Sequence, residues 1–292
     1  MGKTNPAFLF CEKNKGVVDY VMLKSAVWFI TWKCNFRCPY CWEVQRARHG
    51  QIKHEDFLPS DKLAEAWNRL KPEVLDISGG EPFLQPNFID LLEGLQNGIT
   101  VAITTNLAFD MTQFVQRITP LKVFSMTLSY HPSQNLSFEQ FLGRALMLKN
   151  RGFTLTVNFV GYPEQMWLAE SVKQKIEAAG LRWHFDPYSQ TEFYPYKYTP
   201  DEEALLKGQT GTDRQNAFVT VKRPVICSAG FDHVTVFPDG KVYRCINDKI
   251  MGLPPVGDLL DPTLKLNDRM TLCGDYNTCA GCNRDKVKVE DV

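Results

Sequence analysis

Segments with strand propensity alternate with segments of helical periodicity between residues 26 and 185 of this 292-residue chain. Such alternation predicts βαβ units, which assemble into a parallel sheet with helices packed against it. In parallel α/β barrels the reactive groups lie at the carboxyl ends of the strands. The predicted strands are residues 26–32, 74–78, 100–105, 123–129, 153–160 and 181–185, and the predicted helices are residues 61–70 (capped by Ser60), 86–95, 111–118, 138–150 and 164–179.

The composition is that of a globular protein with a sizeable core, because 44% of the residues are hydrophobic. The net charge of zero gives no support to a nucleic-acid substrate, whose phosphates require clustered Lys and Arg. No stretch approaches the roughly 18 apolar residues of a membrane span, and the first residues lack the apolar core of a signal peptide. We therefore expect a cytoplasmic protein without a membrane partner, and nine cysteines at metal-ligand spacing fit that reducing compartment.

Three cysteines, Cys34, Cys38 and Cys41, directly follow the first predicted strand with the spacing Cys-x3-Cys-x2-Cys. A loop with three thiolates at this spacing can hold a cube-shaped iron–sulfur cluster by three of its irons and leave the fourth iron open. The alternatives are half of a zinc site, which would normally be closed by four ligands, and ordinary buried thiols. The spacing, the aromatic Tyr40 before the last cysteine and the preceding strand favour the cluster.

At these residues the chain resembles the radical S-adenosylmethionine (radical SAM) superfamily. The resemblance implies a partial (β/α)6 barrel over residues 24–207 and a [4Fe–4S] cluster whose open iron is chelated by SAM. It also implies reductive cleavage of SAM to a 5′-deoxyadenosyl radical that abstracts a substrate hydrogen. An external one-electron donor, such as a flavodoxin or a ferredoxin, is then a required partner.

The carboxyl ends of the later strands carry candidate SAM-binding residues. Gly79-Gly80-Glu81 matches the family motif that holds the amino group of SAM, although a plain Gly-rich turn is the alternative. The resemblance also places Tyr40 beside the adenine. Short polar side chains at the next strands suit the ribose or the carboxylate, and their alternative role is local hydrogen bonding to the backbone. These candidates are Thr105, Asn106, Ser129 and Asn158.

A second set of cysteines begins with Cys227-x12-Gly240-x4-Cys245, in which Asp239-Gly240 predicts the turn of a β-hairpin. Cys273 and the pair Cys279-x2-Cys282 follow. Taken by themselves, these cysteines could bind either a zinc ion or an iron–sulfur cluster. It resembles the SPASM/twitch extensions of radical SAM enzymes. Five cysteines suit the shorter twitch form with one auxiliary [4Fe–4S] cluster, for which the predicted ligands are Cys227, Cys245, Cys279 and Cys282.

Cys273 is then a spare cysteine: it could replace one of these ligands, pack as a hydrophobic residue or face the substrate, and packing is the expected role. The predicted organisation is an N-terminal extension (residues 1–23), the barrel (residues 24–207) and a twitch-type domain (residues 208–292).

Three side chains near strand ends are candidates for the general base that takes an alcohol proton: His131, His184 and Asp186. A structural hydrogen bond is the alternative for each histidine. A fully ligated auxiliary cluster would serve electron transfer, which favours a net two-electron oxidation of a small molecule. The resemblance points to twitch-type dehydrogenases that oxidise a hydroxyl of a sugar or cyclitol.

The other candidate function is a peptide-modifying radical SAM enzyme that crosslinks or epimerises a ribosomal peptide. Only 33 residues precede Cys34, too few for the peptide-recognition domain that many such enzymes carry, which favours the small molecule. A non-enzymatic iron–sulfur carrier or zinc module is disfavoured, because Gly79-Gly80-Glu81 and the open cluster corner would have no purpose in it.

Overall fold

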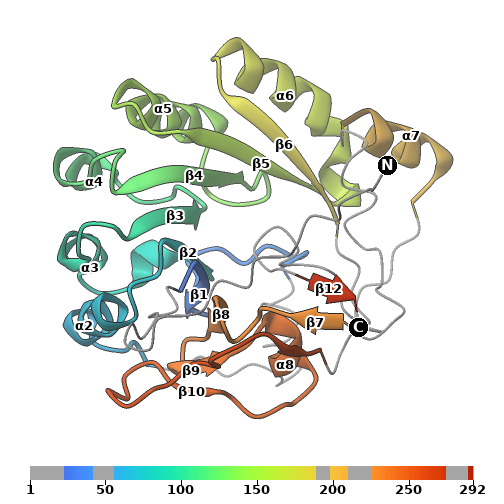
Figure 1. Cartoon of the computed structure of the whole chain (residues 1–292). Helices are drawn as coiled ribbons and strands as arrows, with labels where there is room; N and C mark the ends of the chain where they lie inside the picture. The colour runs from blue at the N-terminus through green and yellow to red at the C-terminus, as the bar shows by residue number, and fades with distance from the viewer. Residues whose placement is uncertain (1–22, 42–55, 189–197, 210–224, 274–288, 292) are drawn as a thin grey trace, which may run out of the picture.

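A nine-stranded sheet forms the centre of the protein, and the parallel α/β architecture confirms the predicted fold class (Figure 1). The structure is a computed structural model that describes residues 23–41, 56–188, 198–209, 225–273 and 289–291. The strand order is β10-β9-β8-β1-β2-β3-β4-β5-β6. Among the described strands, β6 and β10 are the edges of this sheet, so it stays open like the expected partial barrel. The six barrel strands, all parallel, are β1 (Ser25–Thr31), β2 (Val74–Gly79), β3 (Thr100–Thr105), β4 (Val123–Tyr130), β5 (Leu155–Gly161) and β6 (Arg182–Pro187).

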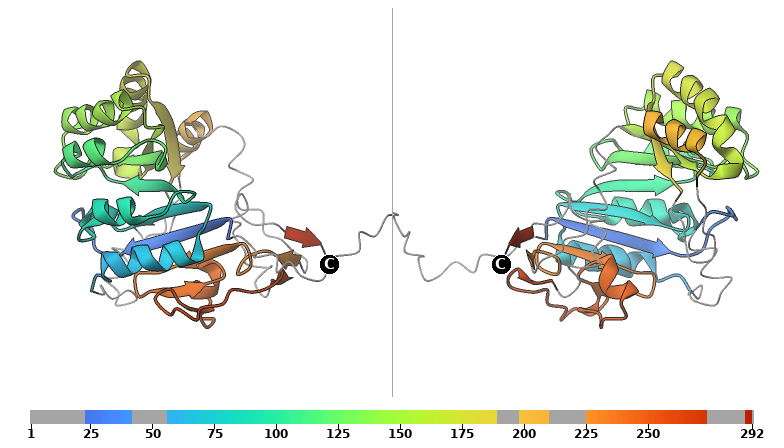
Figure 2. Two further views of the ribbon diagram at one scale, coloured as in Figure 1. Left: turned by 60° about the vertical axis from the view of Figure 1, so that its left-hand side comes forward. Right: turned by 90° about the vertical axis from the view of Figure 1, so that its right-hand side faces the viewer.

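Helices cover the outer face of these six strands (Figures 1 and 2). Alternate strand residues point to this face, as the pleat of a strand requires. In β1, for example, the buried Trp28 packs against Trp67 with a ring-centroid distance of 5.4 Å. The helices of this layer are α2 (Ser60–Leu70), α3 (Phe88–Gly94), α4 (Thr112–Arg117), α5 (Phe138–Asn150) and α6 (Ala169–Ala178), with the 3₁₀ helices η1 (Pro82–Leu84) and η2 (Pro163–Leu168) between strands and helices.

The inner face of the sheet carries short polar side chains. On β4, Tyr130 packs against Phe141 of α5, with their ring centroids 5.0 Å apart. The preceding residue, Ser129, therefore points to the opposite face of the sheet. Ser129 pairs in register with Asn158, and Asn158 pairs with His184. These three residues therefore form one cross-strand row on the inner face, near the carboxyl ends of their strands.

The C-terminal part of the chain joins the same sheet. Strand β8 (His233–Val236) pairs in parallel with β1, and the predicted hairpin with β9 (Lys241–Tyr243) is confirmed. At its turn, Gly240 has a φ of +77°, which favours glycine, and its N–H donates to Phe237 O at 2.9 Å. Strand β10 (Gly257–Asp258) then pairs antiparallel with β9. The cysteine-bearing segment is thus built directly onto the first barrel strand.

A smaller sheet has the order β11-β7-β12, with β7 (Val225–Cys227) between β11 (Thr271–Leu272) and β12 (Val289–Asp291). Two further helices are α7 (Pro200–Gln209) and the short α8 (Ile246–Ile250), which follows Cys245. Within the described ranges, no helix is both long and apolar enough to cross a membrane. The predicted domain boundary after residue 207 stays a prediction.

Several predicted element ends differ from the structure. The prediction that Ser60 caps α2 was wrong: Ser60 is the first helical residue, and its hydroxyl donates to Pro86 O. The predicted helix over residues 86–95 begins only at Phe88, because Asn87 adopts a left-handed φ of +55°. The first turns of the predicted helix over residues 164–179 form the 3₁₀ helix η2, which starts at Pro163.

Candidate functional site

The three N-terminal cysteines lie in the loop that leaves β1. Cys38 is buried, and Cys34 and Cys41 are partly buried. Two N–H groups point at Cys34 Sγ: Phe36 N at 3.4 Å and Asn106 Nδ2 at 3.7 Å. Hydrogen bonds to a cysteine sulfur stabilise its thiolate and tune a bound cluster. The thiol set and these donors fit a cluster held by three thiolates.

Within the described residues, no group of three or more His, Cys, Asp or Glu side chains is arranged to hold a single metal ion. A zinc ion needs its ligands around one point, with sulfur–zinc distances of about 2.3 Å. Each thiolate on a cubic cluster instead binds a different iron.

The glycines of the Gly79-Gly80-Glu81 motif bring the end of β2 against the start of the cysteine loop. A Cβ on Gly80 would lie 2.2 Å from Lys33 O, and one on Gly79 would lie 2.3 Å from Thr31 O. Gly80 N donates to Thr31 O at 2.7 Å, and Glu81 N donates to Lys33 O at 2.9 Å. The close approach that requires these glycines is thus to the chain's own backbone, which fixes the entry to the cysteine loop.

The Glu81 carboxylate is buried, with only 1% of the residue exposed. Oε1 accepts from Thr105 Oγ1 at 2.8 Å and from Phe83 N at 3.1 Å, and Oε2 accepts from Asn106 N at 2.7 Å. Burial raises the pKa of Glu81 from 4.5 to about 7, although the three hydrogen bonds oppose the change. A buried carboxylate with this pKa is stabilised in its charged form by a cation placed beside it.

Asn106 connects the end of β3 to the cysteine loop. Its Nδ2 donates to Asn35 Oδ1 at 2.8 Å, and its Oδ1 accepts from Ala108 N at 2.9 Å. Thr105 and Asn106 therefore both make the hydrogen bonds within the chain that were the alternative to a cofactor role. Their contacts with SAM stay a prediction.

Tyr40 is buried against the loops that follow β4 and β5. Its hydroxyl lies 2.8 Å from His131 Nδ1, and its ring centroid lies 5.0 Å from that of Tyr162. Burial lowers the pKa of His131 to about 4, so this ring is neutral at pH 7. His131 thus lies within hydrogen-bond distance of the Tyr40 hydroxyl. The role of His131 as a base and the stacking of Tyr40 on adenine stay predictions.

The other two candidate bases lie together on the inner face of β6. His184 Nε2 is 2.8 Å from Asp186 Oδ1. In the next strand, Asn158 is buried, and its Oδ1 has no hydrogen-bond partner. A buried polar atom without a hydrogen-bond partner destabilises the folded protein. The row Ser129, Asn158 and His184 therefore offers hydrogen-bonding groups to a ligand over the inner face.

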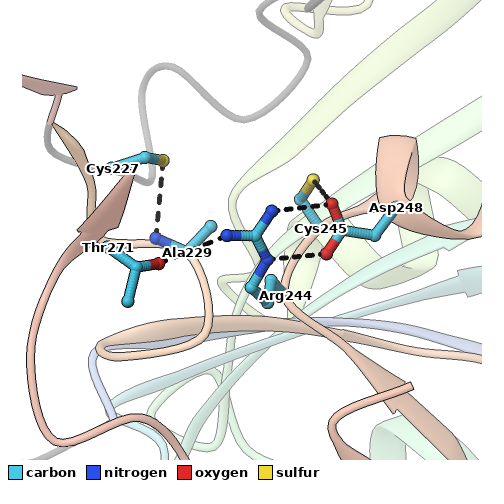
Figure 3. A network of polar contacts seen from close by, with 6 residues as sticks. All are labelled: Cys227, Ala229, Arg244, Cys245, Asp248 and Thr271. Atoms are coloured by element: carbon cyan, nitrogen blue, oxygen red, sulfur yellow. Dashed lines mark hydrogen bonds and ion pairs between the residues drawn. The ribbon is translucent and has the colours of Figure 1, made fainter. Parts of the chain in front are cut away.

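Arg244 lies between Cys227 and Cys245 of the second cysteine set (Figure 3). Arg244 donates from Nε to Asp248 Oδ2 at 2.7 Å and from Nη2 to Asp248 Oδ1 at 3.1 Å. Its Nη1 donates to Thr271 Oγ1 at 3.2 Å. Cys245 Sγ lies 3.7 Å from Asp248 Oδ1, and Ala229 N donates to Cys227 Sγ at 3.5 Å.

The pKa of Arg244 is raised, first by the hydrogen bond to Asp248 and then by charges that include Cys245 and Cys273. The sequence analysis missed the pair Arg244 and Asp248. Its only sequence signal is opposite charges four residues apart next to Cys245. The predicted ligands Cys279 and Cys282 lie outside the described residues.

The sequence profile of the Radical SAM superfamily matches residues 28–173, which begin within β1 and include the cysteine loop and the strands β2 to β5. This chain belongs to the radical SAM superfamily. The family implies a [4Fe–4S] cluster and SAM as its cofactors.

Individual relatives cover only parts of the chain or of their own length. GTP 3′,8-cyclase of Pectobacterium atrosepticum is 35% identical over 94 residues, which are 29% of this chain and 28% of that protein. The antilisterial bacteriocin subtilosin biosynthesis protein AlbA of Bacillus subtilis is 22% identical over 258 residues, 80% of this chain and 57% of that protein. This chain spans less than two thirds of either protein.

Among solved structures, SuiB from Streptococcus suis bound to S-adenosylmethionine superimposes with a TM-score of 0.59 at 15% sequence identity. The match covers 84% of this chain and 65% of SuiB. At this identity the likeness shows the shared fold alone.

Proposed function

We propose that this radical SAM enzyme is an oxidoreductase that converts a hydroxyl-bearing carbon of a small molecule, such as a sugar or cyclitol, into a carbonyl. The hydrogen-bonded pair of His184 and Asp186 carries this proposal. It lies on the inner face of β6, next to Asn158 in the register of the sheet. An imidazole held by a carboxylate is suited to accept the proton of a hydroxyl.

The residues around the cysteine loop hold the cofactors. Cys34, Cys38 and Cys41 hold the cluster, and the buried carboxylate of Glu81 stabilises the amino group of SAM. Tyr40 and the strand-end residues enclose the rest of SAM; these are Gly79, Gly80, Thr105, Asn106, Ser129 and Asn158. When bound and reduced, these cofactors supply a 5′-deoxyadenosyl radical. An external one-electron donor, such as a flavodoxin or ferredoxin, provides the electron, and we place the reaction in the cytoplasm.

Oxidation of the hydroxyl-bearing carbon to a carbonyl requires the loss of a hydrogen atom, a proton and an electron from the substrate. The carbon-bound hydrogen atom leaves to form 5′-deoxyadenosine, the hydroxyl proton leaves to His184, and one electron leaves to a second acceptor. Asp186 orients His184 and stabilises the imidazolium that forms. We assign the electron-accepting role to an auxiliary [4Fe–4S] cluster in a twitch-type domain, with Cys227, Cys245, Cys279 and Cys282 as its ligands.

The same sheet carries the C-terminal cysteines and the cysteine loop. Strand β8 pairs in parallel with β1, and the chain leaves the carboxyl end of β1 for the cysteine loop that carries Cys34. Cys245 is the second residue after β9, which pairs antiparallel with β8, so Cys245 lies level with the amino end of β1. The assignment of this acceptor therefore rests on the spacing of the C-terminal cysteines.

Modification of a ribosomal peptide is the second candidate function. The similarity to AlbA, which extends over 80% of this chain, favours it. His184 and Asp186 would then face the modified residue of the peptide, with the same cofactor arrangement.

The test incubates anaerobically reconstituted protein with SAM, a reductant and a panel of sugars, cyclitols and peptides. We expect a carbonyl product and 5′-deoxyadenosine in equal amounts from one hydroxylated small molecule. Deuterium at the oxidised carbon should appear in the 5′-deoxyadenosine. In His184→Ala, carbonyl formation should fall about 100-fold, while hydrogen abstraction still labels 5′-deoxyadenosine.

Asp186→Asn should reduce the same step, and Asp261→Asn, at an exposed carboxylate, is the matched control. Turnover of peptides alone would replace the first proposal by the second. Equal carbonyl yields from His184→Ala and the unaltered protein would refute the assigned base.

A further inference from the structure

The hydroxyl of Tyr40 lies where the cysteine loop meets the loops that follow β4 and β5. Only 7% of Tyr40 and 5% of Cys38 are exposed. His131 Nδ1 lies 2.8 Å from the hydroxyl, and the side chain of Gln165 also hydrogen-bonds to it. The imidazole is itself held edge-on against Phe36 of the cysteine loop, with ring centroids 5.9 Å apart. Because water has little access to this hydroxyl, its neighbours in the fold determine the hydrogen bonds that it makes.

The same hydroxyl is hydrogen-bonded to Cys38, which lies two residues earlier in the cysteine loop. Burial raises the pKa of Tyr40 above its usual value, and the charge of Cys38 and the hydrogen bond to its sulfur raise it further. The side chains of Gln165 and Ser133 have the opposite effect on this pKa, because they donate hydrogen bonds to the phenolic oxygen. The phenolic oxygen thus accepts from the loops after β4 and β5, while the phenolic hydrogen is directed at the sulfur.

The tautomer of His131 decides where the phenolic hydrogen points. A neutral imidazole has one N–H donor and one bare nitrogen acceptor. If Nδ1 carries the hydrogen, it donates to the oxygen of Tyr40, and the phenolic hydrogen remains for Cys38. The opposite tautomer would accept the phenolic hydrogen itself. A charged thiolate accepts a stronger hydrogen bond than a neutral nitrogen does, so a thiolate at Cys38 favours the first arrangement.

We propose that the Tyr40 hydroxyl donates a hydrogen bond to the Cys38 sulfur and thereby raises the reduction potential of the iron–sulfur cluster, with His131 as the positioning residue. The family implies this cluster, and the inference rests on its placement at Cys34, Cys38 and Cys41 in the proposed function. It gives Tyr40 a role besides enclosing SAM, and it gives His131 a role other than that of a base.

The effect on the potential follows from charge. Reduction adds one negative charge to a cluster, and a hydrogen bond to a ligand sulfur stabilises the more negative state, so the potential rises. Cys38 is buried, whereas Cys34 and Cys41 are only partly buried. A hydrogen bond at a buried sulfur is weakened less by competing water and by a high local dielectric constant. The bond from Tyr40 therefore acts at the ligand where it has the largest effect.

Redox titration of the anaerobically reconstituted full chain, followed by EPR, tests the proposal. The signal of this cluster is the one that changes when SAM is added, because SAM binds its open iron. Tyr40→Phe removes only the hydroxyl, and we expect a lower midpoint potential and the loss of one exchangeable proton coupling in ENDOR spectra. Tyr130→Phe is the matched control. Tyr130 is also buried but packs against Phe141 on the outer face, so this variant should keep the wild-type potential.

His131→Leu provides a second measurement. Without the Nδ1–H donor the hydroxyl is no longer held toward Cys38, so the potential should fall, and adding Tyr40→Phe should lower it little further than Tyr40→Phe alone does. An unchanged potential in Tyr40→Phe, or an equal decrease in Tyr130→Phe, would overturn the role of Tyr40. The wild-type potential in His131→Leu would overturn its positioning role. Absence of a SAM-responsive cluster from the unaltered protein would instead refute the cluster placement of the proposed function.

Discussion

Asn106 Nδ2 donates a hydrogen bond to Asn35 Oδ1 at 2.8 Å and thereby ties the end of β3 to the residue that follows Cys34. The backbone N–H of Asn106 meanwhile donates to Glu81. One residue thus connects the cysteine loop with the buried carboxylate at the end of β2. The polar groups at three successive strand ends are held as a single unit.

Asn106→Ala should loosen the cysteine loop without unfolding the barrel. The change removes the bond to Asn35 and the N–H directed at Cys34 Sγ, so we expect faster loss of cluster absorbance under a mild chelator. Asn68→Ala is the matched control, because Asn68 makes comparable hydrogen bonds on the outer face: its Nδ2 donates to Gly94 O, and its Oδ1 accepts from Gln96 N. Equal cluster lifetimes in the two variants would contradict this role of Asn106.

Gly80→Ala should be strongly destabilising. A Cβ at this position would lie 2.2 Å from Lys33 O, and backbone cannot move away as a flexible side chain can. We expect a loss of about 3 kcal/mol in the free energy of unfolding, measured by urea denaturation of the apoprotein.

Gly143→Ala is its control, since Gly143 lies in α5 with nothing within 4 Å of an added Cβ. That variant should gain about 0.5–1 kcal/mol from helix propensity. The prediction for Gly80 fails if the two variants unfold at the same urea concentration.

Glu81 should make the stability of the apoprotein depend on pH. Its pKa is raised in the fold from 4.5 to about 7, so the protonated form is the one that folding favours. The stability that it contributes is fully present below about pH 4.5 and is lost as the pH rises through 7. The loss amounts to about 3 kcal/mol.

Urea denaturation of the apoprotein between pH 4.5 and 8 would measure this dependence. Glu81→Gln should flatten it, while Glu65→Gln, at an exposed residue of α2, should leave it unchanged. A Glu81→Gln protein with the wild-type pH dependence would show that another group causes it. In the reconstituted protein, Glu81→Gln should also weaken SAM binding, because the variant lacks the carboxylate that we propose as the partner of the amino group.

Arg244 and Asp248 should behave as a coupled pair. Arg244→Ala leaves the carboxylate of Asp248 buried without its cation and should cost about 3–5 kcal/mol. Adding Asp248→Asn removes the stranded charge, so the double variant should be more stable than Arg244→Ala alone. Arg117→Ala, which breaks exposed pairs with Asp90 and Glu93, should unfold close to the wild type. Additive effects of the two changes would disprove the coupling.

Much of the barrel was predictable because its signals are local. Each of the six predicted strands is present, with ends shifted by at most two residues, and the Asp239-Gly240 turn marks the hairpin correctly. The spacing of Cys34, Cys38 and Cys41 and the motif Gly79-Gly80-Glu81 were sufficient to identify the superfamily. These features are read from neighbouring residues, and neither depends on how distant segments meet.

The sequence by itself thus determined the alternation of strands and helices, the cysteine loop after the first strand and the family. Only the tertiary structure decided that β8 pairs with β1 and that the backbone of Gly79 and Gly80 packs against the start of the cysteine loop. It also decided that Arg244 lies near cysteines from separate segments of the chain. Parallel pairing and side-chain contacts across more than a hundred residues leave no local pattern. These long-range contacts are determined by the whole chain, because the native fold must bury the apolar faces of all the elements and also pair their buried polar groups.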